Sequence, residues 1–136
     1  MLVSETPTDL QIKLIDFGFA QKFKKEEGMH LILGSPLYMA PELVKKEVYN
    51  ESIDVWAVGI ITYLLLCGLT PFQAHTIQDI HQNVLSKQVV FEGPIWANIS
   101  DDAKNFIMKC LDRDPKSRNS INWLQLNDPW LQGSVI

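Results

Sequence analysis

The sequence lacks the features of a secreted or disulfide-stabilised protein. It holds two cysteines among 136 residues; Cys67 lies in an apolar run and Cys110 on the apolar side of a predicted helix. We therefore expect two reduced, buried thiols rather than a disulfide. The first five residues carry an acid where a signal peptide carries basic residues, and they lack the glycine of a myristoylation site. These absences favour a cytoplasmic location.

The sequence also has little positive charge. Its formal net charge is -4 and its pI is near 5.3, so no overall positive field attracts a phosphate backbone and nucleic-acid binding is disfavoured. The one basic cluster, Lys22, Lys24 and Lys25, is followed directly by Glu26 and Glu27. This mixture of signs is typical of a solvated loop.

No hydrophobic run is long enough to cross a membrane. The uncharged stretch from Val55 to Leu69 spans fifteen residues, includes Thr62 and Tyr63, and is followed by Pro71. A bilayer requires roughly twenty residues, so we expect a buried central helix and no membrane partner. With 46% hydrophobic and 21% charged residues, the chain has the composition of one compact globular domain.

The first part of the chain predicts minor strands and a loop. Ile12 to Ile15 are predicted to form a strand that ends at Asp16, and Phe19 to Lys22 a second strand. The stretch from Lys22 to Ser35 has charges and glycines but no sustained period, which predicts a surface loop.

The remainder predicts helices. Pro41 suits the first turn of a short helix that runs to about Lys46. Ser52 can cap a long apolar helix, which Gly68 ends after Cys67. A short last helix is predicted for residues 120–126.

Two further helices carry clear capping signals. Thr76 and Asp79 form a capping box at the start of a helix that runs to about Ser86. Ser100 caps the next helix. Its apolar positions recur at helical spacing, and they are Ala103, Phe106, Ile107, Cys110 and Leu111.

Two tripeptides are the most informative motifs. Asp16-Phe17-Gly18 and Ala40-Pro41-Glu42 are separated by the twenty-one residues from Phe19 to Met39. Either tripeptide alone is a weak signal. The two in this order and at this spacing resemble the two ends of a protein-kinase activation segment.

Other segments extend this resemblance over nearly the whole chain. They follow the kinase large lobe in order and comprise Asp54 to Gly59, Gly68 to Phe72, Trp96, Ile99-Ser100, Ala103-Lys104, Asp114-Pro115, Arg118 and Pro129-Trp130. Ile60 to Gly68 are similar to the calmodulin-dependent and calcium-dependent protein serine/threonine kinases. The resemblance implies a mostly α fold with a short β pair, namely the C-terminal lobe of the protein-kinase-like fold without the N-terminal lobe, with residues 1–136 as a partial kinase domain.

Three signatures of a complete kinase are missing. The sequence has no G-x-G-x-x-G pattern among its seven glycines, no V-A-I-K lysine and no H-R-D tripeptide that would supply the catalytic base. We therefore expect a fragment whose Met1 follows the catalytic-loop asparagine of the family, with no catalytic residue present and little or no activity alone. The other class left open is a non-catalytic module that binds kinases, substrates or regulators.

The resemblance implies a cofactor site at Asp16, Phe17 and Gly18. In the family, the aspartate matching Asp16 chelates the magnesium ion that bridges the β- and γ-phosphates of ATP. The intact parent would then move the γ-phosphate of ATP to a hydroxyl of a protein substrate. The residues alone also allow Asp16 to be a turn residue at a strand end.

The resemblance implies a substrate-binding loop at Gly34, Ser35, Pro36, Leu37 and Tyr38. The corresponding loop of the family receives the substrate residue that follows the phosphorylated one, and this sequence resembles the serine/threonine-specific form. The alternative is that Ser35 is a plain turn residue.

Three charged residues are implied to have structural roles. Glu42 matches the family glutamate that pairs with the arginine matching Arg118, although both could be ordinary exposed charges. Asp54 matches an aspartate that accepts hydrogen bonds from the catalytic-loop backbone, which this sequence does not contain. We predict that Asp54 lacks some of its partners and that desolvation raises its pKa.

The sequence contains few signals of regulation. No serine, threonine or tyrosine occurs between Phe19 and Gly34, so loop phosphorylation has no acceptor there. Glu26 and Glu27 are hypothesised to supply constant negative charge instead. Regulation by calcium or calmodulin is not predicted from these residues, because no D-x-[DN]-x-[DN]-G loop is present.

The tryptophans and histidines have two possible interpretations. The tryptophans could form a ligand box, but helix packing is favoured; they are Trp56, Trp96, Trp123 and Trp130. The histidines have no metal-ligand spacing and are expected at the surface; they are His30, His75 and His81.

Overall fold

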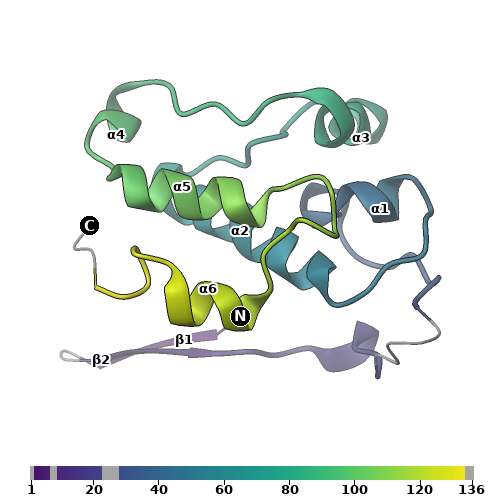
Figure 1. Ribbon diagram of the computed structural model, residues 1–136, viewed down its shortest axis with the longest axis horizontal. Helices are drawn as coiled ribbons and strands as arrows, with labels where there is room; N and C mark the ends of the chain where they lie inside the picture. Colours follow the sequence, from purple (N-terminus) through teal and green to yellow (C-terminus); the bar gives the residue numbers. More distant parts are fainter. Residues whose placement is uncertain (1, 7–8, 23–27, 134–136) are drawn as a thin grey trace.

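The computed structural model describes residues 2–6, 9–22 and 28–133, and it is mostly helical with one short strand pair, as the sequence predicts. The elements in chain order are β1 (Leu2–Thr6), β2 (Asp9–Lys13), the 3-10 turns η1 (Phe17–Phe19) and η2 (Pro36–Tyr38), α1 (Pro41–Val44), α2 (Ser52–Cys67), α3 (Ile77–Ser86), α4 (Pro94–Ala97), α5 (Asp101–Cys110) and α6 (Ile121–Asn127). In Figure 1, α3 and α4 lie along one edge, and α6 and the strand pair lie along the opposite edge. Within the described ranges, no helix is long and apolar enough to span a membrane.

The strand pair lies earlier in the chain than predicted. β1 and β2 pair antiparallel, with Leu2 opposite Lys13. The strand predicted at residues 12–15 is therefore shifted, and residues 19–22 form no strand. Lys13 pairs with Leu2, the first residue of β1, so Leu14 and Ile15 have no described partner. Asp16, whose φ of 62° lies in the left-handed region, then turns the chain before η1.

Helix α2 is the centre of the fold and packs along α5 (Figure 1). Its residues Trp56, Ile60 and Tyr63 are buried, which confirms the predicted buried central helix. The two helices approach closely at Gly59, since a Cβ atom built on this residue would lie 2.7 Å from Cβ of Cys110. Glycine at this position therefore sets the distance between α2 and α5.

The helix ends follow the capping signals with one exception. Thr76 and Ser100 each accept a hydrogen bond from the backbone N–H three residues later, at 3.1 and 3.3 Å. Gly68 ends α2 with a φ of 79°, a conformation that favours glycine. Ser52 was expected to cap α2 but is its first residue, and the side chain of Asn50 accepts the N–H of Ser52 at 2.9 Å instead.

Among the described residues, two clusters of buried side chains form the core. In the larger cluster, Trp56 stacks on Phe72 with ring centroids 5.6 Å apart. The smaller cluster joins α2, α5 and α6, and it consists of Val55, Phe106, Cys110 and Leu124. Because α2 contributes to both clusters, its position fixes both halves of the core.

The tryptophans pack largely as predicted. Trp56 and Trp96 are buried, and Trp96 lies on α4, a helix that the sequence did not predict. Trp130 is partly buried against Phe106, with ring centroids 5.1 Å apart. The prediction is wrong for Trp123, which is 42% exposed.

The cysteines and histidines need two corrections. Cys110 is buried, and desolvation raises the pKa of its thiol to about 12, but Cys67 is only half-buried. His30 and His75 are exposed as expected. His81 is half-buried, and its Nε2 atom is shielded from solvent without a hydrogen-bond partner among the described residues.

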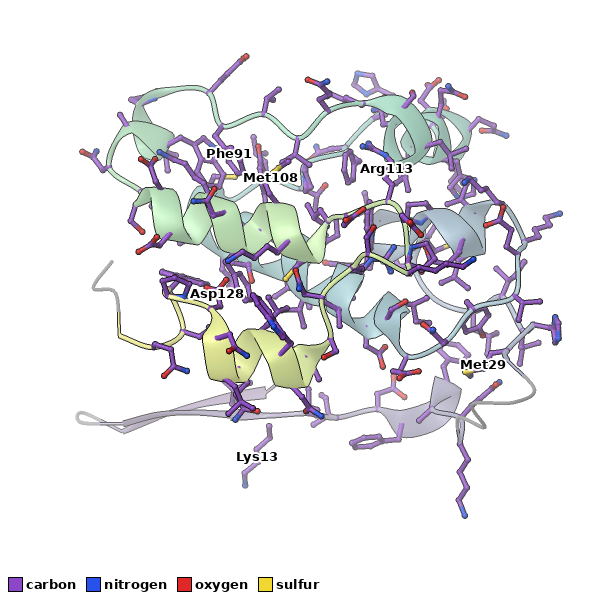
Figure 2. The ribbon with its side chains drawn as sticks, in the orientation of Figure 1. Lys13, Met29, Phe91, Met108, Arg113 and Asp128 are labelled. Carbon is purple, nitrogen blue, oxygen red and sulfur yellow. The ribbon has the colours of Figure 1, made fainter. Side chains whose placement is uncertain are left out.

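Two charged side chains link helices through hydrogen bonds. Arg113 follows α5, and Figure 2 shows it on the side of α3, where its Nε atom donates to the carbonyl oxygen of Val84 at 2.8 Å. Burial lowers the pKa of this guanidinium. Asp128 lies between α5 and α6 in Figure 2, is fully buried, and accepts a hydrogen bond from Nζ of Lys109 at 2.7 Å. These contacts tie α3 and α6 to the α5 region.

We predict that Gly59→Ala destabilises the fold. Alanine gains about 1 kcal/mol of helix propensity over glycine, but its methyl group would meet Cβ of Cys110, an atom that cannot rotate away. Overpacking of this kind costs about 1–3 kcal/mol, so urea denaturation should show a net loss of unfolding free energy. The control is Leu65→Ala, since Leu65 on the same helix is 68% exposed. A Gly59→Ala variant more stable than the parent would contradict the close crossing.

Candidate functional site

The predicted structural pair forms a buried ion pair. Glu42 lies in the first turn of α1, and Arg118 lies in the connection between α5 and α6. Nη1 of Arg118 donates to Oε1 of Glu42 at 2.7 Å, and Nη2 donates to Oε2 at 3.0 Å, which is the two-bond geometry that a guanidinium and a carboxylate favour. Their side chains are 0% and 1% exposed, so the alternative of ordinary surface charges is wrong.

Arg118 also binds two backbone carbonyls. Its Nε atom donates to the carbonyl oxygen of Asp112 at 2.8 Å, and Nη1 donates to that of Ser52 at 2.9 Å. The guanidinium carbon lies 5.3 Å from the ring centroid of Trp56, within the range of a cation–π contact. One side chain therefore holds the starts of α1 and α2 and the end of α5 together.

Asp54 lies in the first turn of α2 and lines three hollows of the surface, two of which also border the predicted activation segment. Among the described residues, no hydrogen bond reaches its carboxylate. Desolvation, and secondarily the charge of Glu51, raises the pKa of Asp54. This is the predicted direction. The start of a helix favours a negative charge, which acts in the opposite direction.

Asp16 lies at the surface between β2 and η1. One of its carboxylate oxygens accepts a hydrogen bond from the N–H of Gly18 at 3.3 Å, and the other has no partner among the residues that the structure describes. Phe17 between them is 68% exposed. This is the geometry of a turn residue, and it also leaves one carboxylate oxygen available to a cation.

The predicted substrate-binding loop, Gly34, Ser35, Pro36, Leu37 and Tyr38, contains the turn η2 directly before α1. Gly34 has a φ of 113°, a conformation that side chains rarely adopt. The turn packs against α2 and α3. The side chain of Ser35 is exposed, and its hydroxyl makes no capping hydrogen bond to the turn, so it remains available at the surface.

The two hollows bring the predicted segments together around Asp54. One hollow, of about 380 Å³, extends from residues 19–21, which follow Asp16-Phe17-Gly18 closely, to Tyr49 and Asp54. The other, of about 140 Å³, is lined by Asp54 and by Gly34, Ser35 and Tyr38 of the loop. Segments from both ends of the predicted activation segment therefore border the same carboxylate.

The basic and acidic cluster falls largely in a part of the chain that is left undescribed. Lys24, Lys25, Glu26 and Glu27 lie outside the described residues. The hypothesis that the two glutamates supply a constant negative charge remains a prediction.

Sequence reasoning missed Tyr49, which is buried beside the site. Its phenol O–H donates to the carbonyl oxygen of Leu31. Met29 and Tyr49 also form an isolated antiparallel bridge. The signal that could have found it is an aromatic residue in a short, mostly polar connection between two predicted helices.

Comparison with known proteins points to one family. The family model of the protein kinase domain matches residues 1–131. Calcium-dependent protein kinase 27 of Oryza sativa subsp. japonica is 45% identical over 126 residues, which cover 93% of this chain and 20% of that protein. Calcium-dependent protein kinase 3 of the same species is 42% identical over 90% of the chain and 22% of that protein. Calcium-dependent protein kinase 13 of Arabidopsis thaliana is 42% identical over 90% and 23%. The chain thus spans about a fifth of the length of these relatives.

We predict that Glu42→Gln strongly destabilises the fold, because it leaves the guanidinium of Arg118 buried without a counter-charge. Breaking a buried pair in this way costs about 3–5 kcal/mol, measurable by urea denaturation. The control is Asp101→Asn, which breaks the pair of Asp101 and Lys104 at a site where the aspartate side chain is 93% exposed; exposed pairs contribute less than about 1 kcal/mol. Equal losses of unfolding free energy in the two variants would show that the buried pair stabilises the fold no more than the exposed pair does.

We predict that Asp54→Asn makes the unfolding free energy depend less on pH. The raised pKa means that folded Asp54 binds its proton more tightly than unfolded Asp54 does, so its ionised form destabilises the fold. This destabilisation is absent below the ordinary pKa of 3.8, grows as the pH rises, and is complete above the raised pKa. Thermal unfolding should show the variant to be more stable than the parent at pH 7, with a difference that shrinks towards pH 3. A difference that instead grows in acid would contradict the assignment.

Proposed function

We propose, given that the chain belongs to the protein kinase family, that the protein which carries it transfers the γ-phosphoryl group of ATP to serine or threonine hydroxyls of a protein substrate. In this proposal the chain supplies the helical lobe and the activation segment, which we define as Asp16 to Glu42. Asp16 would hold magnesium, and Gly34 to Tyr38 would receive the substrate.

The arrangement around Asp54 is the observation that carries the proposal. Residues 19–21 and the Gly34–Tyr38 loop border adjoining hollows that share Asp54. Phosphoryl transfer depends almost entirely on positioning and on neutralising the charge of the phosphates. A metal-binding segment and a substrate loop must therefore lie near one another. Asp16, Phe17 and Gly18 line neither hollow; the support is that residues 19–21, which directly follow them, border the hollow that shares Asp54 with the hollow of the loop. The buried pair of Glu42 and Arg118 holds the start of α1, the helix that follows the loop.

Asp16 fits a magnesium ligand by its chemistry. In phosphate-transfer sites, magnesium is held by one or two carboxylates, by substrate phosphates and by water. Asp16 offers an exposed carboxylate oxygen, and its other oxygen is oriented by the N–H of Gly18. No group of three or more His, Cys, Asp or Glu side chains suited to a metal occurs in the described ranges. Bound magnesium would neutralise charge on the phosphates, and the part of this chain is to present the carboxylate.

A second candidate function is a non-catalytic interaction module. Its support is a run of exposed apolar side chains next to the site: Leu14, Phe17 and Phe19 are 78%, 68% and 66% exposed. Contiguous exposed apolar surface marks interaction sites. This candidate needs no phosphoryl transfer, so the assay below separates the two.

Calcium is the regulator that we propose for the whole protein. The support is that the relatives at 42–45% identity are named calcium-dependent protein kinases. Phosphoryl transfer measured with added calcium and with a calcium chelator tests this proposal, and equal rates would contradict it.

We predict that the protein which carries this chain phosphorylates synthetic serine and threonine peptides, but not tyrosine peptides, with ATP and magnesium. Asp16→Asn should lower kcat by about a hundredfold or more, because a bound metal ion contributes several kcal/mol of charge stabilisation. The control is Asp101→Asn at an exposed position, which should keep kcat unchanged. A folded protein that transfers no phosphate, yet still binds a protein partner, would contradict the kinase proposal and support the interaction module.

A further inference from the structure

The connection between α1 and α2 holds the segment that leads into the substrate loop. Met29 and Tyr49 exchange two backbone hydrogen bonds, from N of Met29 to O of Tyr49 at 2.9 Å and from N of Tyr49 to O of Met29 at 3.1 Å. The phenol O–H of Tyr49 donates to the carbonyl oxygen of Leu31. Three hydrogen bonds therefore tie residues 29–31 to one tyrosine.

The segments that contain Met29 and Tyr49 approach each other closely at this bridge. Gly28 has a φ of 65°, and a Cβ atom built on it would overlap the side chain of Val48. Glycine therefore suits this position for both its conformation and its size. The phenol of Tyr49 is protonated at neutral pH, and burial raises its pKa further.

Tyr49 lies in a connection that is held in place at both ends. Before it, the N–H of Glu47 donates to the carbonyl oxygen of Glu42 at 2.9 Å. After it, Ser52 begins α2. Glu42 and Ser52 both accept hydrogen bonds from Arg118, so one buried guanidinium holds both ends of the connection. The hydrogen bonds of Tyr49 therefore link residues 29–31 to the part of the fold that Arg118 holds together.

We propose that Tyr49 is a positioning residue that holds the activation segment in place for substrate binding without phosphorylation of residues 19–34. The proposal rests on the proposed function above. Residues 19–34 contain no hydroxyl side chain, so a phosphate that recruits arginines cannot order them. The hydrogen bonds of Tyr49 act on the same stretch. Because residues 29–31 continue directly into the Gly34–Tyr38 loop, the path that Tyr49 imposes sets where this loop begins.

Tyr63 provides a matched control. Tyr49 and Tyr63 are each 7% exposed, and burial raises the pKa of both. The O–H of Tyr63 also donates to a backbone carbonyl, that of Val90 at 2.9 Å, a residue outside the activation segment. Replacing either tyrosine by phenylalanine removes one hydroxyl and keeps the ring. The hydroxyl of Tyr63 also interacts with the side chains of Trp96 and Cys67, and its partners all lie outside residues 19–34.

The first test is hydrogen exchange on the protein that carries this chain. Tyr49→Phe should speed amide exchange of residues 28–35 by about twofold to tenfold, the range that the net worth of one neutral hydrogen bond allows. Tyr63→Phe should leave this segment unchanged, and both variants should leave α5 unchanged. Equal exchange of residues 28–35 in the two variants would overturn the proposal, whether or not the protein is an active kinase.

The second test separates positioning from a purely structural role. With a synthetic serine peptide that the wild type phosphorylates, Tyr49→Phe should raise KM for the peptide by about twofold to tenfold, with kcat and KM for ATP unchanged. Tyr63→Phe should change none of the three. Equal kinetics of the two variants overturns the role of Tyr49 in substrate binding. A protein that shows the exchange difference but transfers no phosphate contradicts the proposed function, and leaves Tyr49 with a structural role alone.

Discussion

The fold depends on one buried guanidinium. Arg118 pairs with the carboxylate of Glu42, donates to the carbonyl oxygens of Ser52 and Asp112, and lies over the ring of Trp56. A charge buried in this way is tolerated only when its partners are all in place. Segments far apart in the sequence are therefore held in one mutual arrangement, because a shift of any of them would leave a buried hydrogen-bonding group unpaired.

The Gly34–Tyr38 loop and Asp54 take their positions from this buried arrangement. The Gly34–Tyr38 loop leads directly into α1, whose first turn holds Glu42, and Asp54 follows Ser52 by half a turn of α2. Both therefore extend outwards from residues that Arg118 fixes. The close approach of α2 and α5 at Gly59 brings together the helices that form much of the core. The candidate site is thus a surface feature on a rigid base, which suits a reaction that depends on positioning.

The helices were predictable where a local capping signal coincided with a clear apolar period, as at Thr76 and Ser100. Prediction failed where distant contacts decided the outcome. Ser52 was expected to cap α2, but its carbonyl and hydroxyl oxygens face Arg118, which is 66 residues away in the sequence, and Asn50 takes the capping role. The strand that was expected to reach Ile15 ends at Lys13, which pairs with the first residue of β1. Sequence patterns therefore indicate which local conformations a segment favours, and contacts with distant residues decide which of these it adopts.

The candidate site was predictable only where both partners are recognisable side chains. Glu42 and Arg118 could be paired across 76 residues because a family resemblance names both. The contacts of Tyr49 with Leu31, of Tyr63 with Val90 and of Arg113 with Val84 all end on backbone carbonyl oxygens. Every residue carries such an oxygen, so residue type does not mark the acceptor. Contacts of this kind become visible only when the path of the chain is known.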